Sequence, residues 1–275
     1  MLDKDEEKTN DYKIMTLADF IRDAMNRDPF IQHWVLDFSL RRGKMEDLHE
    51  FILDVYYPHL VGLRKHKKVL TYLKPGLTLD GGCGTGWLSL LLYKNGHKVV
   101  SIDLSMSSIS LAKKLFEVEK ADIPLVRAAS TYLPFRKELF DSIVMCDVVE
   151  HIPDIGLAMS EVKRVTKNKA KVSITIPNGF GWWEMSIRLL DPIFRMLNFK
   201  KGLIEETHVH YFTKKTFEKL LQLHGFKDIV IQNIYAVSSI HGLAIIPRFV
   251  NVIDSKIADR LPTWIGTEWS VNCKK

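Results

Sequence analysis

The stretch Leu79-Asp80-Gly81-Gly82-Cys83-Gly84-Thr85-Gly86-Trp87 decides the fold, because an apolar segment leads into it and an amphipathic segment leads out of it. Glycine occupies the alternate positions Gly82, Gly84 and Gly86. Residues without a β-carbon adopt positive φ angles easily and let the backbone approach a ligand at the start of a helix. The stretch therefore predicts a strand, a tight turn and a helix that together bind a nucleotide-like cofactor.

The spacing of these glycines argues against a dinucleotide loop. Counted from Gly82, the pattern G-x-G-x-x-G needs a glycine at position 87, which is Trp87 in this chain. A pyrophosphate site is therefore not expected, and a nucleotide-dependent oxidoreductase is the less favoured alternative.

An acidic residue follows the second expected strand. Residues 97–102 read as a strand that leads into Asp103, which lies about 20 residues beyond the loop. A carboxylate there can accept hydrogen bonds from both hydroxyls of a ribose and repels a 2′-phosphate. Asp103 is the candidate ribose ligand.

Together these residues resemble the motifs of the class I S-adenosylmethionine-dependent methyltransferases, in which an acidic residue precedes three alternate glycines and a second acid binds the ribose. The segments 132–135, with Leu-Pro-Phe, and 140–151, which ends in Glu150-His151, resemble the family's LPF loop and its fourth strand. The resemblance covers roughly residues 76–234. It implies a Rossmann-like α/β fold with a seven-stranded sheet, S-adenosyl-L-methionine as cofactor, and methyl transfer by direct displacement to a small-molecule or lipid-like acceptor.

The resemblance also implies a set of cofactor-binding residues. The family often has an aspartate at the position of Ala129, where its carboxylate contacts the adenine amino group. With alanine there, the backbone amide of Ser130 or the side chain of Thr131 reads the adenine edge. The missing acid leaves a non-catalytic cofactor-binding or regulatory module as an alternative. The full set is Asp80, Gly82, Gly84, Gly86, Asp103, Leu104, Ser130 and Cys146.

Hydrophobic patterning divides the chain into a helical cap, residues 1–75, and a core, residues 76–275, with an insertion at about 178–212. The alternation of strands and helices predicts a parallel sheet, and by the resemblance the last two strands form a reversed hairpin. The expected strands are 77–81, 97–102, 123–127, 141–147, 170–176, 226–234 and 268–273, and the expected helices of the core are 86–94, 105–119, 155–166 and 213–224.

The insertion predicts a strongly amphipathic helix. Its apolar face carries Trp183, Ile187, Leu190, Phe194 and Leu197. Three interpretations stay open: packing against the core, a lid over an acceptor pocket, or peripheral contact with a membrane surface, which Trp182-Trp183 and Lys200-Lys201 favour.

Candidate catalytic residues are histidines, because methyl transfer to a hydroxyl or a carbon acid is helped by a base that titrates near neutral pH. His151 follows the fourth strand, and His208 follows the insertion, alternating with His210. Asp147 and Glu150 either face the methionine end of the cofactor or cap a helix. The two alternating histidines lack an identifiable third ligand in the sequence, so no metal site is expected.

Bulk composition excludes several classes of protein. The 275 residues are 46% hydrophobic, which predicts one substantial core. The three cysteines, Cys83, Cys146 and Cys273, fit neither a disulfide framework nor a metal spacing, which favours the reducing cytoplasm. The net charge is only +6, and the basic run 64–68 reads as a solvated helix end without a nucleic-acid footprint.

No secretory signal is seen in residues 1–13, and polar residues interrupt the uncharged segment 229–247, so no membrane span is expected.

Overall fold

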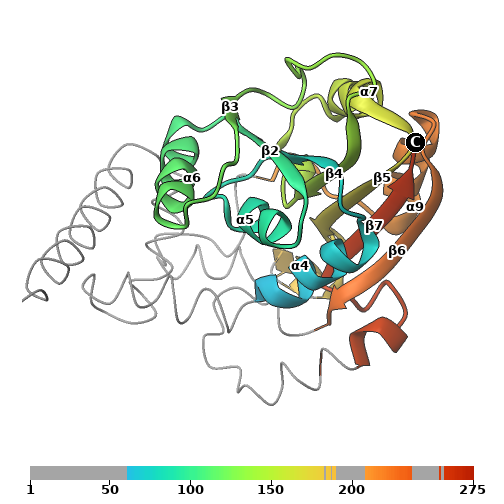
Figure 1. Ribbon diagram of the computed structural model, residues 1–275. Helices are drawn as coiled ribbons and strands as arrows, with labels where there is room; N and C mark the ends of the chain where they lie inside the picture. The colour runs from blue at the N-terminus through green and yellow to red at the C-terminus, as the bar shows by residue number, and fades with distance from the viewer. Residues whose placement is uncertain (1–60, 183, 187, 190–207, 237–253, 255–256) are drawn as a thin grey trace, which may run out of the picture.

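The computed structural model describes residues 61–182, 184–186, 188–189, 208–236, 254 and 257–275. These residues form a seven-stranded sheet with the strand order β3-β2-β1-β4-β5-β7-β6. Figure 1 shows the sheet and the helices around it. The strands are β1 (Leu77–Gly81), β2 (Lys98–Asp103), β3 (Leu125–Arg127), β4 (Phe140–Cys146), β5 (Thr166–Pro177), β6 (Lys227–Tyr235) and β7 (Glu268–Lys274).

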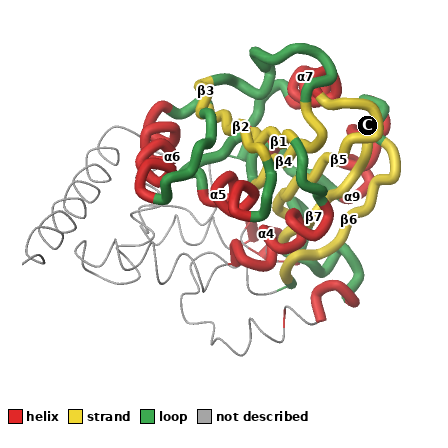
Figure 2. The backbone as a smooth tube through the Cα atoms, viewed as in Figure 1, coloured by secondary structure: helices red, strands yellow, loops and turns green. Residues whose placement is uncertain are grey.

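The first five strands are parallel, and β7 runs antiparallel between β5 and β6. The expected Rossmann-like α/β fold, with its seven-stranded sheet and its reversed hairpin, is therefore confirmed. Strand β1 lies inside the sheet between β2 and β4 (Figure 2), so the turn that follows it opens at the carboxyl edge where the strand order reverses. Open parallel sheets bind their ligands at this edge.

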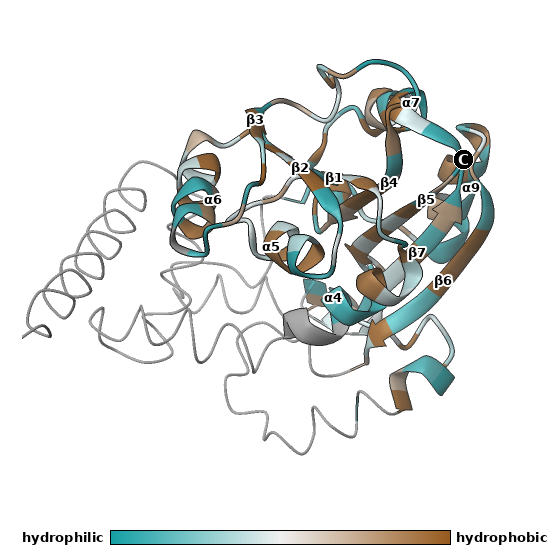
Figure 3. Ribbon diagram, in the orientation of Figure 1, coloured by the Kyte–Doolittle hydropathy of each residue, from teal (hydrophilic) through white to brown (hydrophobic). Residues whose placement is uncertain are grey.

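Helices cover both faces of the sheet. One face packs against α4, α5 and α6, and the other against α7 and α9. Helix α6 carries both hydrophobic and hydrophilic residues (Figure 3), as expected for a helix that covers one side of a sheet. The helices are α4 (Val61–Tyr72), α5 (Trp87–Lys94), α6 (Met106–Val118), α7 (Ile155–Val165) and α9 (Lys214–Leu223), with single 3-10 turns η3 (Val149–His151) and η4 (Ala258–Arg260).

Short polar side chains set the beginnings of these helices. The hydroxyl of Ser105 accepts the amide of Ser108 at the start of α6, and Asp154 accepts the amide of Leu157 at the start of α7. At the start of α9, Thr213 forms a capping box with Thr216. Such caps satisfy amides that have no partner inside the helix.

Two strands begin more than one residue away from their predicted starts. Strand β3 begins at Leu125 instead of 123, because Pro124 has no amide to donate, although its carbonyl accepts the amide of Ser101 at 2.9 Å. Strand β5 begins at Thr166 instead of 170, because Thr166 pairs with Phe140 beyond an irregularity in the register. Both differences arise from pairing with a neighbouring strand.

Only the last part of the predicted helical cap lies within the described residues. This part is α4, which packs on the sheet through Val69 and Leu73, and Tyr72 donates its hydroxyl proton to the carbonyl of Cys273 at 2.9 Å. Residues 1–60 and most of the insertion lie outside the described part, including the apolar positions Trp183, Ile187, Leu190, Phe194 and Leu197 and the pair Lys200-Lys201. No helix in the described part of the chain is long and apolar enough to span a membrane.

Gly86 gives a test of the packing around the start of α5. Its φ is +88°, and an added β-carbon would lie 2.9 Å from Ala112 and from the ring of Phe116. Gly86→Ala should lower the free energy of unfolding by roughly 2 to 4 kcal/mol, through backbone strain and overpacking together. Gly96→Ala is the matched control, since Gly96 has a φ of +84° but nothing within 4 Å of an added β-carbon. Urea unfolding should show a loss of only about 1 kcal/mol for the control; equal losses would contradict the packing described for Gly86.

Candidate functional site

The glycine turn combines two kinds of glycine. All three alternate glycines have positive φ angles, 93° for Gly82, 52° for Gly84 and 88° for Gly86. A β-carbon on Gly82 would lie 2.4 Å from Val148, whereas one on Gly84 would meet nothing within 4 Å. Gly82 and Gly86 are therefore required by the protein's own packing, and Gly84 faces open space that a ligand can enter.

Backbone hydrogen bonds hold this turn against β2. The amides of Gly82 and Cys83 both donate to the carbonyl of Ile102 at 2.8 Å. The amide of Gly84 donates to Oδ2 of Asp103 at 2.8 Å, and the amide of Ser105 donates to Oδ1 at 2.8 Å. An ionised carboxylate has about four lone-pair positions, so these two bonds do not by themselves fill it. The predicted ribose ligand is thus oriented beside the open side of the turn.

Asp80 lies beneath the turn instead of facing it. Its side chain is buried, and its Oδ2 accepts a hydrogen bond from the Ser89 hydroxyl at 2.6 Å. The hydroxyl of Ser101 donates in turn to that of Ser89 at 2.7 Å. Burial raises the pKa of Asp80 to about 7, although the hydrogen bond from Ser89 by itself lowers it. Asp80 therefore fastens α5 to β1 and β2, and any effect it has on the cofactor acts through the turn.

The other predicted cofactor residues follow the same edge of the sheet. Leu104 comes directly after β2 and is exposed, and its carbonyl accepts a hydrogen bond from Arg127 Nε at 3.0 Å. Ser130 is half-buried and lies in a turn closed by the amide of Tyr132 and the carbonyl of Ala129, at 3.0 Å. Cys146 is half-buried at the end of β4. Their assignment to the cofactor stays a prediction.

Two of the candidate histidines come together. The backbone carbonyl of Glu150 accepts the amides of Val209 and His210, at 2.9 and 3.1 Å, which draws the segment after the insertion alongside η3. As a result the rings of His151 and His208 lie 4.8 Å apart between centroids. One carboxylate oxygen of Glu150 and one nitrogen of each histidine lie within 4.8 Å of one another. These three residues are called the Glu-His-His group below.

His210 is held elsewhere. Its Nε2 lies 3.0 Å from the carbonyl oxygen of Ile152 and 3.1 Å from that of Pro153, and carbonyls only accept, so Nε2 carries the proton. His208 and His210, which alternate in the sequence, therefore have different surroundings. His208 lies beside His151, and His210 is hydrogen-bonded to the backbone.

Lys65 was misread from the sequence as part of a solvated run. It is 8% exposed, and its Nζ forms ion pairs with Asp147 and with Glu268 Oε1. Burial opposes its charge, but the two carboxylates hold the pKa of Lys65 well above its usual value. A feature of the sequence could have predicted this burial. Lys65, Val69 and Leu73 are spaced by four residues, which places the lysine on the buried side of α4.

This ion cluster adjoins the Glu-His-His group. Asp147 has a φ of +54°, and its Oδ1 accepts the hydroxyl of Thr175 at 2.9 Å. Burial raises the pKa of Glu268 to about 8, even though Lys65 lowers it. Burial also raises the pKa of Glu150 well above its usual value, and the charge of Asp147 adds to this. Three carboxylates thus face one lysine at the carboxyl ends of β4 and β5.

The glycine turn and the Glu-His-His group share one edge of the sheet. Strands β1 and β4 are paired in register, with Asp80 beside Val144. Beyond the strands, Val148 lies against Gly82 so closely that no side chain fits between them. A nucleotide-like ligand on the turn would therefore lie next to the segment that carries Glu150 and His151.

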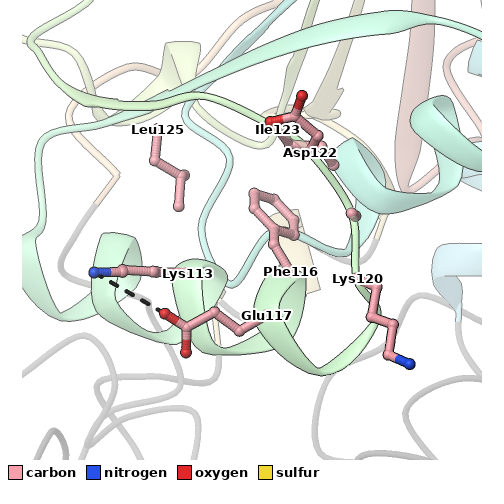
Figure 4. Close-up of a pocket in the computed structure, with 8 residues that line it drawn as sticks. Lys113, Phe116, Glu117, Lys120, Asp122, Ile123 and Leu125 are labelled. Atoms are coloured by element: carbon pink, nitrogen blue, oxygen red, sulfur yellow. Dashed lines mark ion pairs between the residues drawn. The ribbon is translucent and has the colours of Figure 1, made fainter.

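A surface hollow shown in Figure 4 is separate from this edge. It lies between α6 and the amino end of β3, and Lys113 and Glu117 form an ion pair of 4.0 Å across its rim. Its lining residues are Lys113, Phe116, Glu117, Lys120, Ala121, Asp122, Ile123 and Leu125. None of the predicted site residues is among them.

Residues 79–174 match a family model described as "Methyltransferase domain". The demethylmenaquinone methyltransferase of Lactobacillus johnsonii is 24% identical over 61% of this chain and 75% of that protein. The ubiquinone biosynthesis O-methyltransferase of Pelagibacter ubique is 26% identical over 76% of this chain and 90% of that protein.

Solved structures show the same fold. A SAM-dependent methyltransferase from Thermotoga maritima, described as a possible histamine N-methyltransferase, gives a TM-score of 0.57 at 15% identity, over 83% of this chain and 96% of that chain. A SAM dependent methyltransferase from Archaeoglobus fulgidus gives 0.56 at 18% identity, over 82% and 99%.

The buried Asp80 predicts a pH dependence of stability. Its folded pKa of about 7 lies above the usual 3.8, so the cost of burying its charge grows as the pH rises between these values. Relative to Asp80→Asn, the wild-type chain should lose roughly 2 to 3 kcal/mol of unfolding free energy between pH 5 and pH 8. Chemical unfolding of both proteins at several pH values measures this difference.

Asp141→Asn is the control for this experiment. A hydrogen bond from Lys167 lowers the pKa of Asp141, so its protonation does not change between pH 5 and pH 8. Its difference from the wild type should stay constant over that range. A constant difference for Asp80→Asn as well would contradict the buried, protonated carboxyl.

Proposed function

Because this chain belongs to the class I S-adenosylmethionine-dependent methyltransferases, with its methyltransferase domain at residues 79–174, we propose that it methylates a hydroxyl oxygen of a small or lipid-like acceptor. The observation that carries this proposal is the Glu-His-His group, with the rings of His151 and His208 4.8 Å apart. The group lies at the edge of the sheet that also carries the glycine turn.

The turn fits the adenosyl cofactor, which supplies the methyl group as part of a sulfonium. Gly84, with a φ of +52° and no atom within 4 Å of an added β-carbon, leaves room for a ligand against the backbone. Asp103, held by the amides of Gly84 and Ser105, presents a carboxylate to the ribose hydroxyls. Leu104, Ser130 and Cys146 complete the proposed cofactor side.

The acceptor side has to orient a hydroxyl and favour the loss of its proton. Methyl transfer forms a new O–CH₃ bond while the S–CH₃ bond breaks, so no covalent intermediate with the protein is needed and alignment supplies much of the rate. A hydroxyl is a weak nucleophile, and imidazole nitrogens are the side-chain groups that can assist it near neutral pH. His151 and His208 provide them.

Exposed apolar side chains on the described part of the insertion support a lipid-like acceptor. Trp182, Met185 and Leu189 recur at three and four residues and are exposed. In the same segment the guanidinium carbon of Arg188 lies 4.1 Å from the ring centroid of Tyr211, whose ring is 6.1 Å from that of His208. Two relatives, named for demethylmenaquinone and for ubiquinone biosynthesis, support an acceptor built around a ring with an apolar tail.

The ribose assignment is tested by binding alone. Asp103→Ala should weaken S-adenosylmethionine binding by about ten- to a hundredfold, because it removes charge-assisted bonds worth roughly 1.5 to 3 kcal/mol in total. Gly84→Val should weaken it further, since the added side chain fills the open space beside the turn. Asp228→Asn, an exposed carboxylate paired with Lys274 on β7, is the control and should bind normally. Calorimetric titration measures all four proteins, and unchanged affinity in Asp103→Ala would refute the assignment.

The acceptor side is tested by turnover at saturating cofactor. With a panel of alkylated catechols as acceptors, His208→Gln should lower kcat by about 10² to 10⁴-fold, the range for loss of proton-transfer assistance. The dissociation constant of the cofactor should change by less than about threefold, under roughly 0.7 kcal/mol. His210→Gln is the matched control, because the ring of His210 donates to the backbone carbonyls of Ile152 and Pro153 and is not part of the Glu-His-His group. Methylation of amines such as histamine, but of no hydroxyl in the panel, would overturn the proposed acceptor class.

A further inference from the structure

We propose that Glu150, His151 and His208 bind one divalent transition-metal cation at the acceptor side of the fold. This inference rests on the proposed function, since it says how the Glu-His-His group would activate an acceptor oxygen. The sequence alone offered only two alternating histidines, and the third ligand emerges from a contact between residues far apart in the chain.

The geometry of the group suits a shared ion. The three potential ligand atoms lie within 4.8 Å of one another. Ligands bound about 2.0 to 2.2 Å from a zinc ion lie roughly 3 to 4 Å apart. A change of about 1 Å, within the range of side-chain rotation, would therefore bring all three onto one cation.

Glu150 supplies an independent indication. Its side chain is only 1% exposed, and its buried Oε2 has no hydrogen-bond partner among the residues that the structure describes. Leaving a buried carboxylate oxygen unsatisfied costs at least about 1 to 3 kcal/mol. A cation on this oxygen would remove the penalty, which explains why a glutamate is held there.

The backbone holds the ligands in place before any ion binds. Glu150 and His151 are consecutive residues of η3, and the carbonyl of Glu150 accepts the amides of the two residues that follow His208. Two of the three side chains therefore come from one turn, and the third is tied to that turn by two hydrogen bonds. Such support is what a metal site needs to keep its ligands aligned.

The local charge also favours a cation. Asp147, Glu268 and Glu150 gather around a single lysine, Lys65, and the Asp147 charge acts directly on Glu150. Within the described part of the chain this leaves an excess of carboxyl groups around one lysine, with the side chain of Asp147 partly exposed to solvent. A divalent ion bound to Glu150 would offset that excess.

The donor set indicates which ions fit. Two imidazole nitrogens and one carboxylate suit Zn²⁺, Fe²⁺, Co²⁺ or Mn²⁺, whereas Ca²⁺ and Mg²⁺ prefer oxygen ligands throughout. Three protein ligands leave at least one position open on the ion. A hydroxyl of the acceptor bound there would lose its proton to solvent more readily, so His151 and His208 would assist as ligands of the cation instead of taking the proton themselves, and no change of oxidation state is involved.

The test is a titration of the full-length chain, without a polyhistidine tag and stripped by a chelator. Calorimetry with Zn²⁺ should show one site per chain, and Co²⁺ should give visible ligand-field absorption typical of nitrogen ligands. His208→Gln and Glu150→Gln should weaken Zn²⁺ binding at least about tenfold and remove the Co²⁺ spectrum. His210→Gln, the neighbouring histidine held by backbone carbonyls, should bind both ions within about threefold of the wild type.

Glu150→Gln also shows whether a loss of metal binding is caused by unfolding of the protein. Glutamine has nearly the shape of glutamate and adds no charge to the buried position, so the amide should leave the thermal melt of the stripped chain nearly unchanged. Absence of stoichiometric Zn²⁺ binding, or binding that persists in His208→Gln, would overturn the inference. Cofactor titrations and turnover assays on the stripped protein separate the two proposals. If the cofactor binds and turnover proceeds but Zn²⁺ does not bind, only the metal site is overturned. If Zn²⁺ binds but no hydroxyl is methylated, the acceptor class is overturned.

Discussion

The arrangement depends on a close approach between the turn after β1 and the segment after β4. Gly82 and Val148 leave no room for a β-carbon, and the amides of Gly82 and Cys83 are fixed on the carbonyl of Ile102. This contact has two consequences. Gly84 is left facing open space beside Asp103, and the residues that follow Val148 are brought to the edge where a ligand on the turn would end.

The ion cluster beside the Glu-His-His group is assembled from distant parts of the chain. Lys65 on α4 connects Asp147 after β4 with Glu268 at the start of β7, so the helix that precedes the sheet is tied to the site. Removing one partner of a buried ion pair leaves an uncompensated charge, which is more costly than the pair's net contribution to stability. The cluster is therefore a device that fixes the position of Asp147 and the segment after it, more than a source of stability.

Local patterns in the sequence predicted the strand, turn and helix around the alternate glycines. The alternate glycines, the acid after the second strand and the strand-helix alternation depend on backbone geometry within a few residues, and these features reappear in β1, α5 and β2. The Glu-His-His group was predicted only in part, because its contacts are long-range. His208 meets His151 through hydrogen bonds between the backbones of Glu150 and residues 209 and 210, and no spacing in the sequence reports such a contact. The burial of Asp80 and Lys65 was missed for the same reason, since a charged side chain reads as solvated until its partners are known.

The most direct test of the account is a crystal structure of the chain with S-adenosylhomocysteine bound. The account places the ribose hydroxyls on Asp103, the backbone of Gly84 against the ligand, and the sulfur toward residues 147–151. A ligand bound away from the turn, or one whose ribose does not contact Asp103 and whose sulfur faces away from Glu150 and His151, would contradict it.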